Sequence, residues 1–145
     1  MRVVIFGATG MVGMGVLKEC LDDDDVEDVL VVGRRESGVQ HAKLRELIHK
    51  DFFDYSPIRA ELSDRDTCFF CLGVSSVGQS EESYTRLTHD LALAAAEALV
   101  GVASGMAFVY VSAAGADPTE QSGSMWARVR GRLENKLLGI PFRAA

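Results

Sequence analysis

Short apolar runs recur along this chain, and most of them end at a glycine or a serine. They are too short for helices and are rich in valine, isoleucine and phenylalanine, so they predict strands buried on both faces of a parallel sheet. Segments with apolar residues at helical spacing separate several of these runs, which is the pattern of a doubly wound α/β fold. The expected strands are residues 3–6, 29–32, 43–48, 67–72 and 107–112, and the third is expected to be exposed on one side.

The segments between and after these runs predict helices. Ser80 is a favourable N-cap residue, and Glu81 and Glu82 follow it in the first turn, where the helix dipole favours acidic side chains. The expected helices are 14–20, a short one at 58–62, one from Ser80 to Gly101 and one at 124–138, and residues 142–145 begin a sixth strand. One face of the helix after Ser80 is expected to be core or interface and carries Tyr84, Leu87, Leu91, Ala94, Ala95 and Ala98. The last helix is expected to bury Met125, Val129, Leu133 and Leu137.

Three glycines follow the first strand directly and lead into the first helix. Gly7 allows a tight turn, Gly10 lets the backbone approach a phosphate, and Gly13 lets helix and strand pack closely, an order that suits a nucleotide pyrophosphate. The unpaired N–H groups of the first helical turn and the helix dipole then favour an anion. The alternative is a tight turn that binds nothing. The candidate cofactor residues here are Gly7, Thr9, Gly10, Met11, Val12 and Gly13.

The second strand ends in Gly33, Arg34 and Arg35. A fold that prefers NAD places an acidic residue at this point to hold the ribose 2′-hydroxyl. Guanidinium groups match a phosphate in charge and shape, so the two arginines predict NADP(H) in preference to NAD(H). The alternative is that both are surface residues.

The ends of the third, fourth and fifth strands supply further candidates, three for the cofactor site and one for the substrate. Asp51 follows the third strand, where a side chain often contacts adenine, although a turn aspartate explains it equally well. Leu72 and Gly73 end the fourth strand, and the small residues after them let the chain pass close to a nicotinamide ribose. Ser112 ends the fifth strand at the same sheet edge, where open α/β folds bind ligands, and is placed to touch a substrate.

Composition and charge narrow the function classes. The 145 residues suffice for one domain with a real core, and the formal net charge of −6 argues against a nucleic-acid-binding surface. No apolar run approaches the length of a membrane span and no signal region precedes the first strand, so we expect a cytoplasmic protein. The acidic run from Asp22 to Asp28 lacks the spacing of a calcium loop and is expected to be a solvated connection. The pattern leaves the oligomeric state open.

The cysteines and histidines do not predict a metal site. Cys68 and Cys71 have the spacing of a redox or zinc pair, but residues three apart on a strand point to opposite faces. We therefore expect two buried thiols. The three histidines show no ligand spacing with one another.

Taken together, four motifs resemble the atypical short-chain dehydrogenase/reductases, most closely the branch of Tat-interacting-protein-like and nucleoside-diphosphate-sugar epimerase-like oxidoreductases. The motifs are Gly7–Gly13, Gly33–Arg35, Cys71–Gly73 and Val111–Asp117. The resemblance implies a Rossmann fold with strand order 3-2-1-4-5 and NADP(H) bound across the glycine turn. It also implies a single NAD(P)-binding domain over residues 1–145, without the C-terminal part that closes the substrate pocket in this family.

The sequence departs from the family pattern at the catalytic residues. In the family, a serine after the fifth strand acts with a tyrosine and a lysine spaced Tyr-x-x-x-Lys on the next helix. Ser112 matches the serine, but Trp126 and Arg130 stand at the other two positions. Indole has no proton that titrates near neutral pH, and arginine is permanently charged, although Arg130 can still hydrogen-bond a ribose. Their i,i+4 spacing also sets up a cation–π contact.

Two functional hypotheses follow for these candidate catalytic residues. The first is an NADP-dependent oxidoreductase or epimerase-like enzyme of unknown substrate. The second is a catalytically impaired regulator or sensor that binds NADP(H), which the replacements at Trp126 and Arg130 favour.

Overall fold

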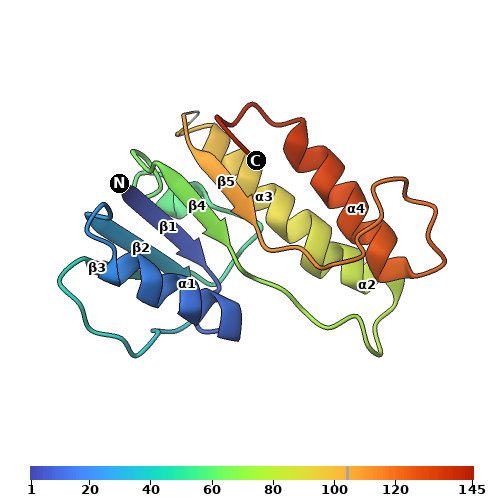
Figure 1. Cartoon of the computed structure of the whole chain (residues 1–145), viewed down its shortest axis with the longest axis horizontal. Coiled ribbons are helices and arrows are strands. Elements are labelled where there is room, and N and C mark those ends of the chain that lie inside the picture. Colours follow the sequence, from blue (N-terminus) through green and yellow to red (C-terminus); the bar gives the residue numbers. More distant parts are fainter. Residues whose placement is uncertain (104) are drawn as a thin grey trace.

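A five-stranded parallel sheet forms the centre of the computed structural model, which describes residues 1–103 and 105–145. The strand order is β3-β2-β1-β4-β5, and every neighbouring pair is parallel, as the resemblance implied (Figure 1). Because the order reverses between β1 and β4, the carboxyl ends of these two strands diverge into loops on opposite sides and leave space for a ligand. The strands are β1 (Arg2–Phe6), β2 (Asp28–Gly33), β3 (Leu44–Ile48), β4 (Thr67–Phe70) and β5 (Ala107–Tyr110).

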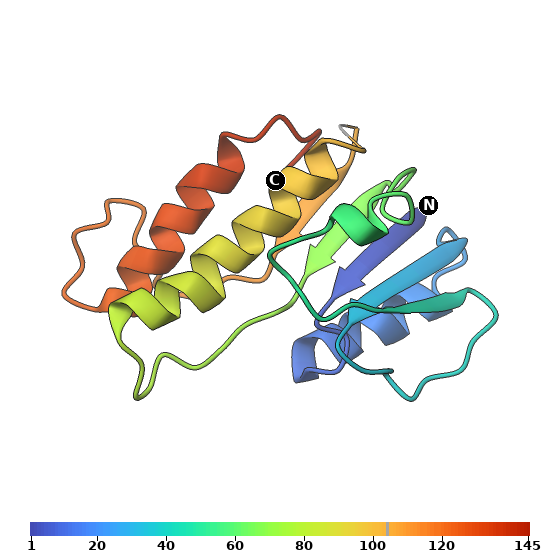
Figure 2. The ribbon, with the colours of Figure 1, turned by 180° about the vertical axis from the view of Figure 1, so that it is seen from behind.

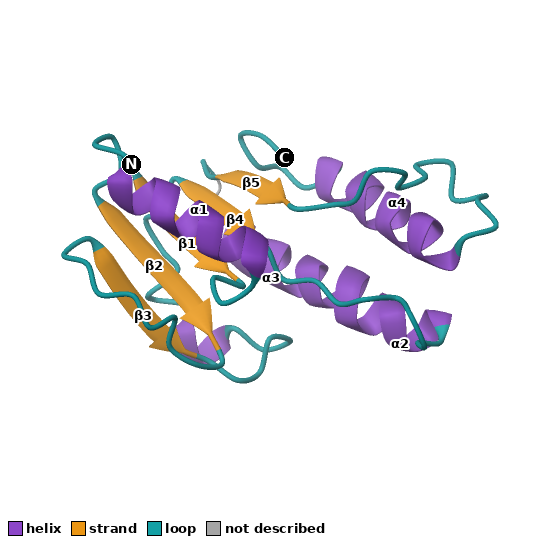
Figure 3. Cartoon of the chain, turned by 60° about the horizontal axis from the view of Figure 1, so that its bottom comes forward, coloured by secondary structure: helices purple, strands orange, loops and turns teal. Residues whose placement is uncertain are grey.

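Helices cover both faces of the sheet and divide the core in two (Figures 1 and 3). Leu17, Cys20 and Leu21 pack from one helix against the β1–β2 face, while the other helices pack on the opposite face. The last two long helices lie side by side there (Figure 2). The helices are α1 (Met11–Asp22), η1 (Ser56–Ile58), α2 (Glu81–Thr85), η2 (Arg86–Asp90), α3 (Leu91–Val100) and α4 (Met125–Leu138).

Two helix predictions were wrong in their bounds. Helix α1 begins at Met11 and not at residue 14, because the Gly10 carbonyl already accepts a hydrogen bond from the Met14 N–H at 2.8 Å. The short helix expected at 58–62 is instead the single 3₁₀ turn η1, followed by turns. Pro57 favours that earlier start, since its missing N–H would have no partner in a first turn.

The helix predicted after Ser80 is interrupted by a π turn, η2. The Ser80 hydroxyl accepts the Ser83 N–H at 3.1 Å, so the predicted N-cap is confirmed. A π turn holds one more residue than an α turn, which shifts the buried face by one position. Leu87, which the pattern placed on a core or interface face, therefore does not lie in the core and is 38% exposed. The buried side chains of η2 and α3 are Thr88, His89, Ala92, Ala95, Ala96 and Leu99.

The two cysteines around β4 differ in their environment. Cys68 is fully buried, as predicted, whereas Cys71 follows the end of the strand and is only half-buried. Burial raises the pKa of the Cys68 thiol, and burial together with Cys20 raises the pKa of Cys71 to about 11. Neither thiol is therefore a thiolate at neutral pH.

The predictions for the last helix and for the sixth strand had different outcomes. Helix α4 buries Val129, Leu133 and Leu137 as expected, and Met125 is half-buried. The expected sixth strand is reduced to one parallel bridge between Ala144 and Ala107. In the part of the chain that the structure describes, no helix has the length and apolar character needed to cross a bilayer.

Candidate functional site

The turn between β1 and α1 has a backbone that only glycine satisfies. Gly7 has a φ of +85°, and a Cβ there would lie 2.9 Å from the carbonyl carbon of Cys71. A Cβ on Gly13 would lie 2.1 Å from the Gly7 oxygen, so the first turn of α1 packs directly onto the strand end. The Gly10 N–H donates to that same oxygen at 3.0 Å and closes the turn.

The start of α1 is open to solvent and rich in unpaired donors. The first intrahelical bond is made by Met14, so the N–H groups of Met11, Val12 and Gly13 have no acceptor within the helix. Thr9 and Gly10 are exposed, and the Met11 side chain is 91% exposed. This combination of N–H groups and helix dipole suits an anion.

Two adjoining cavities extend from this turn along the carboxyl edge of the sheet, and together we call them the carboxyl-edge cleft. Arg34, Phe52 and Leu72 line both cavities, so the two lie next to each other. The cavity beside the glycine turn measures about 460 Å³, and the one beyond Phe52 about 350 Å³. The first is also lined by Gly7, Ala8, Thr9, Val31, Gly33 and Arg35, and the second by Lys50, Asp51, Phe53, Gly73, Val74, Leu87 and Leu91.

Arg34 and Arg35 lie exposed at the rim of this cleft. Among the described residues, neither forms an ion pair, whereas five other arginines pair with carboxylates. Two unneutralised guanidinium groups beside a helix N-terminus make this part of an otherwise acidic protein positive.

Asp51 is a turn aspartate, one of the two alternatives for its position, and it also lines a cavity. Its Oδ1 accepts the Phe53 N–H at 2.9 Å and so fixes the turn after β3, and its side chain lines the second cavity. Leu72 and Gly73 reach the same cavity from the end of β4. Of the predicted cofactor residues, those that line one or the other cavity are Gly7, Thr9, Arg34, Arg35, Asp51, Leu72 and Gly73. Gly10, Met11, Val12 and Gly13 lie at the start of α1 and line neither cavity.

Arg130 connects α4 to the neighbouring elements through buried hydrogen bonds. Its Nε donates to the Tyr84 hydroxyl at 3.0 Å, and its Nη1 donates to the Tyr110 hydroxyl at 3.1 Å and to the Val111 carbonyl at 3.4 Å. A Cβ on Gly73 would lie 3.8 Å from its Nη2, so the guanidinium lies close to the end of β4. Burial raises the pKa of Tyr110 to about 12, although the nearby Arg130 charge opposes the rise.

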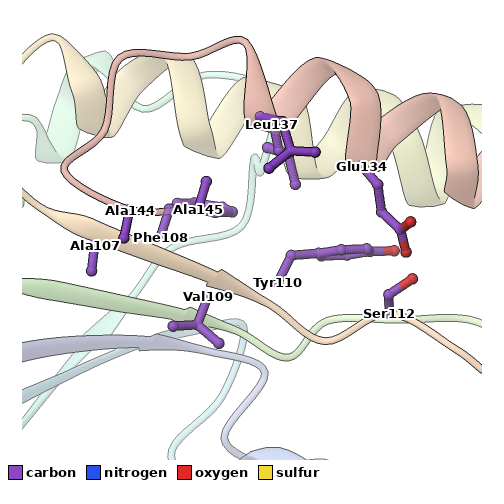
Figure 4. Close-up of a pocket in the computed structure, with 10 residues that line it drawn as sticks. Ala107, Phe108, Val109, Tyr110, Ser112, Glu134, Leu137, Ala144 and Ala145 are labelled. Carbon is purple, nitrogen blue, oxygen red and sulfur yellow. The ribbon is translucent and has the colours of Figure 1, made fainter. Parts of the chain in front are cut away.

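Ser112 lies at one end of a separate groove between β5, α4 and the C-terminal residues, with a volume of about 520 Å³. Its Oγ is buried and has no hydrogen-bond partner among the described residues. Figure 4 shows this hydroxyl, the Tyr110 hydroxyl and the Glu134 carboxylate pointing toward one another. The rest of the groove is lined by Ala107, Phe108, Val109, Leu137, Leu138, Ala144 and Ala145.

The sequence reasoning did not identify Tyr110 or Glu134 as site residues. Tyr110 sits in an apolar strand and Glu134 on a helix whose surface is mostly charged, so neither pattern sets it apart. The one available signal was the tyrosine itself, because a phenol inside a strand needs a hydrogen-bond partner once buried.

Trp126 packs on the loop after β5. A Cβ on Gly115 would lie 3.3 Å from Cη2 of the indole, and Gly115 has a φ of +96°. The predicted cation–π contact with Arg130 is wrong, because that guanidinium turns to the two tyrosines instead. The cation–π contact that the described residues do form is Arg86 over the Phe53 ring, at 4.4 Å.

The sequence profile of the NAD dependent epimerase/dehydratase family matches residues 3–126, the stretch that holds the sheet, the glycine turn and the cleft. The chain belongs to this family. The match and the strand order confirm the Rossmann fold and the epimerase-like family that the resemblance implied.

Two curated relatives are similar to this chain over nearly its whole length. It is 25% identical over 143 residues to "Protein FMP52, mitochondrial" of Meyerozyma guilliermondii, covering 98% of this chain and 60% of the relative. It is 27% identical over 142 residues to "Protein HTATIP2" of Rattus norvegicus, covering 97% of this chain and 57% of that protein. The second supports the Tat-interacting-protein-like branch. The chain thus spans about 60% of the length of the first relative.

Solved structures confirm the fold at low sequence identity. Uronate dehydrogenase from Agrobacterium tumefaciens, solved as a mutant complexed with NAD, superposes with a TM-score of 0.72 at 17% identity, covering 93% of this chain and 54% of that one. The UDP-glucose 4-epimerase of Thermotoga maritima, solved with UDP-glucose, gives 0.73 at 15% identity, covering 97% and 51%.

Proposed function

We propose that this protein binds NADP(H) along the carboxyl-edge cleft and is an oxidoreductase of the atypical short-chain dehydrogenase/reductase type. The observation that carries the proposal is that an open helix N-terminus and two guanidinium groups without an ion-pair partner among the described residues lie beside the same cleft. A family profile named for NAD dependence and a structural neighbour solved with NAD support the dinucleotide.

The residues present fit such a cofactor from end to end. The N–H groups at Met11 to Gly13, with Thr9 and Gly10 beside them, would hold the pyrophosphate. Arg34 and Arg35 would hold the 2′-phosphate, since each is free to form charged hydrogen bonds. Asp51 would contact the adenine, Leu72 and Gly73 would let the chain pass close to the nicotinamide ribose, and Arg130 would hydrogen-bond that ribose. When bound, NADPH supplies a hydride for reduction of a substrate.

The chemistry of the reacting centre rests on Ser112. Its buried hydroxyl has a free hydrogen-bonding capacity that a substrate oxygen would satisfy. Trp126 cannot give or take the proton, and the loss of such a group typically lowers a rate by about 10²–10⁴-fold. Tyr110 lies near Ser112, but its raised pKa of about 12 makes the phenol a weak acid.

A second candidate function is a regulator that binds NADP(H) without turnover. It is favoured by one observation, that Trp126 packs against Gly115 as a structural side chain and offers no titratable group. The two candidates share the cofactor and differ only in chemistry.

The experiment that tests the proposal is a pair of fluorescence titrations with NADPH and NADH. We expect NADPH to bind at least about tenfold more tightly, because each charged hydrogen bond to the 2′-phosphate contributes about 1.5–3 kcal/mol. Equal or tighter binding of NADH would refute the preference. A panel of quinones, aldehydes and sugar nucleotides then separates the candidates. Turnover that Ser112→Ala abolishes supports the oxidoreductase, and binding without turnover supports the regulator.

A further inference from the structure

We propose that the π turn η2 (Arg86–Asp90) forms the outer wall of the adenosine pocket, with Leu87 contacting the base and Arg86 positioning Phe53 beside it. This inference rests on the proposed cofactor and assigns binding and positioning roles to two residues outside the glycine and arginine motifs.

Exposed apolar side chains surround the second cavity of the cleft. Leu87 and Phe53 are each 38% exposed and Val74 is 36% exposed, and all three line the same space of about 350 Å³. They come from three segments far apart in the sequence. In the absence of a ligand, water contacts these side chains. Exposed apolar side chains around one cavity indicate a ligand-binding surface.

The π turn is what places Leu87 in this position. In an uninterrupted α-helix its spacing from Tyr84 and Leu91 would direct it toward a core or interface face, as the sequence pattern predicted. The wider turn instead buries Thr88 and His89 and leaves Leu87 at the cavity wall. π turns of this kind occur mostly where a helix serves a functional site.

Arg86 fixes the aromatic side of the pocket. Its guanidinium carbon lies 4.4 Å from the centre of the Phe53 ring, and within the described chain it pairs with no carboxylate. This contact ties η2 to the loop after β3 across the cavity mouth. The ring is thereby held in place before a ligand arrives, which lowers the entropy cost of binding.

The polar groups of the same cavity define the ligand class. Asp51 uses Oδ1 for the Phe53 N–H, and its Oδ2 has no partner among the described residues, so it can accept from an exocyclic amine. Lys50 and Arg34 bring positive charge to the same space. An aromatic base with an amine donor, linked to a phosphate, satisfies all of these groups, and the adenosine 2′-phosphate half of NADP(H) is such a ligand.

The test measures affinity for NADPH and for 2′,5′-ADP, which carries the adenosine half alone. Leu87→Ala should weaken both ligands by the same factor, about fivefold, and Arg86→Gln by about threefold. Leu87→Glu should weaken both by roughly thirtyfold or more, since it places a carboxylate beside the phosphates. Gln121→Glu is the control: it changes the net charge equally at an exposed residue that lines neither the cleft nor the Ser112 groove, and it should stay within about twofold of the original protein.

The outcomes separate the two proposals. If the unaltered protein binds neither NADPH nor 2′,5′-ADP, the proposed function fails and takes this inference with it. If it binds both and the Leu87 variants match Gln121→Glu, the proposed function stands and the role of η2 is refuted. Because Leu87 is exposed, its variants should keep the melting temperature of the ligand-free protein, which excludes misfolding as the cause of lost affinity.

Discussion

Arg34 and Arg35 have no partner of opposite charge within the described chain, unlike five of the other arginines. Unpaired guanidinium groups on a surface cost little, because water solvates them. At the rim of a cleft they retain their full capacity for a phosphate.

Replacing either arginine by alanine should therefore weaken NADPH binding and spare NADH. The expected loss is roughly 10- to 150-fold in Kd for NADPH, equivalent to one or two charged hydrogen bonds of about 1.5–3 kcal/mol. Parallel titrations with the two cofactors measure it. Equal losses for NADH would show that the arginines bind something common to both molecules.

Ser112 offers a test in which stability and function move in opposite directions. Its Oγ is buried without a partner among the described residues, so Ser112→Ala removes an unsatisfied polar group and should raise the free energy of unfolding by about 1 kcal/mol in urea. Any turnover should fall in the same variant. A destabilised Ser112→Ala protein would mean that the hydroxyl is satisfied by an ordered water.

At the scale of elements, the packing of α1 on the end of β1 depends on the absence of a side chain at one position. The Gly13 backbone sits against the Gly7 carbonyl, while Gly15, two residues further along the same helix, has nothing within 4 Å of the place where a Cβ would be. The same helix thus contains a glycine that the fold requires and one that it does not.

Gly13→Ala should destabilise the protein by about 3 kcal/mol or more, since its Cβ would lie 2.1 Å from a backbone oxygen. Gly15→Ala is the control and should stabilise it by about 0.5–1 kcal/mol through helix propensity. Urea denaturation of both variants measures the difference. Similar values for the two would contradict the close helix–strand contact.

For the molecule as a whole, three aspartates at separate places couple stability to pH. Burial alone would raise the pKa of Asp28, but hydrogen bonds from Arg45 and Arg65 lower it below its ordinary value. A hydrogen bond from Ser56 lowers the pKa of Asp54, and one from Thr119 lowers that of Asp117. Lowered pKa values mean that the folded state holds these protons less tightly than the unfolded chain does.

The contribution of these groups is complete above the unfolded aspartate pKa of about 3.9 and is lost as the pH falls through the lower folded values. Thermal unfolding should therefore show a fall in Tm below about pH 4. Asp28→Asn should lower stability at neutral pH by about 3 kcal/mol, because it leaves the buried Arg65 without its counter-ion, and should flatten the acid slope. An unchanged slope would exclude Asp28 from the acid transition.

What the sequence by itself determined was everything governed by local chemistry. The short apolar runs specified five strands, Gly7 and Gly13 specified a turn that no other residue fits, and Ser80 specified a helix start, because each depends on neighbours within a few positions. The tertiary structure decided what depends on distant segments. The phase of the helix after Ser80 changed at η2, Arg130 found Tyr84 and Tyr110 in place of Trp126, and Ser112 came to lie in the groove beside Glu134. Periodicity cannot reveal such outcomes, since one extra residue in a turn redirects every side chain after it, and a buried guanidinium bonds to whichever oxygens the packing brings within reach.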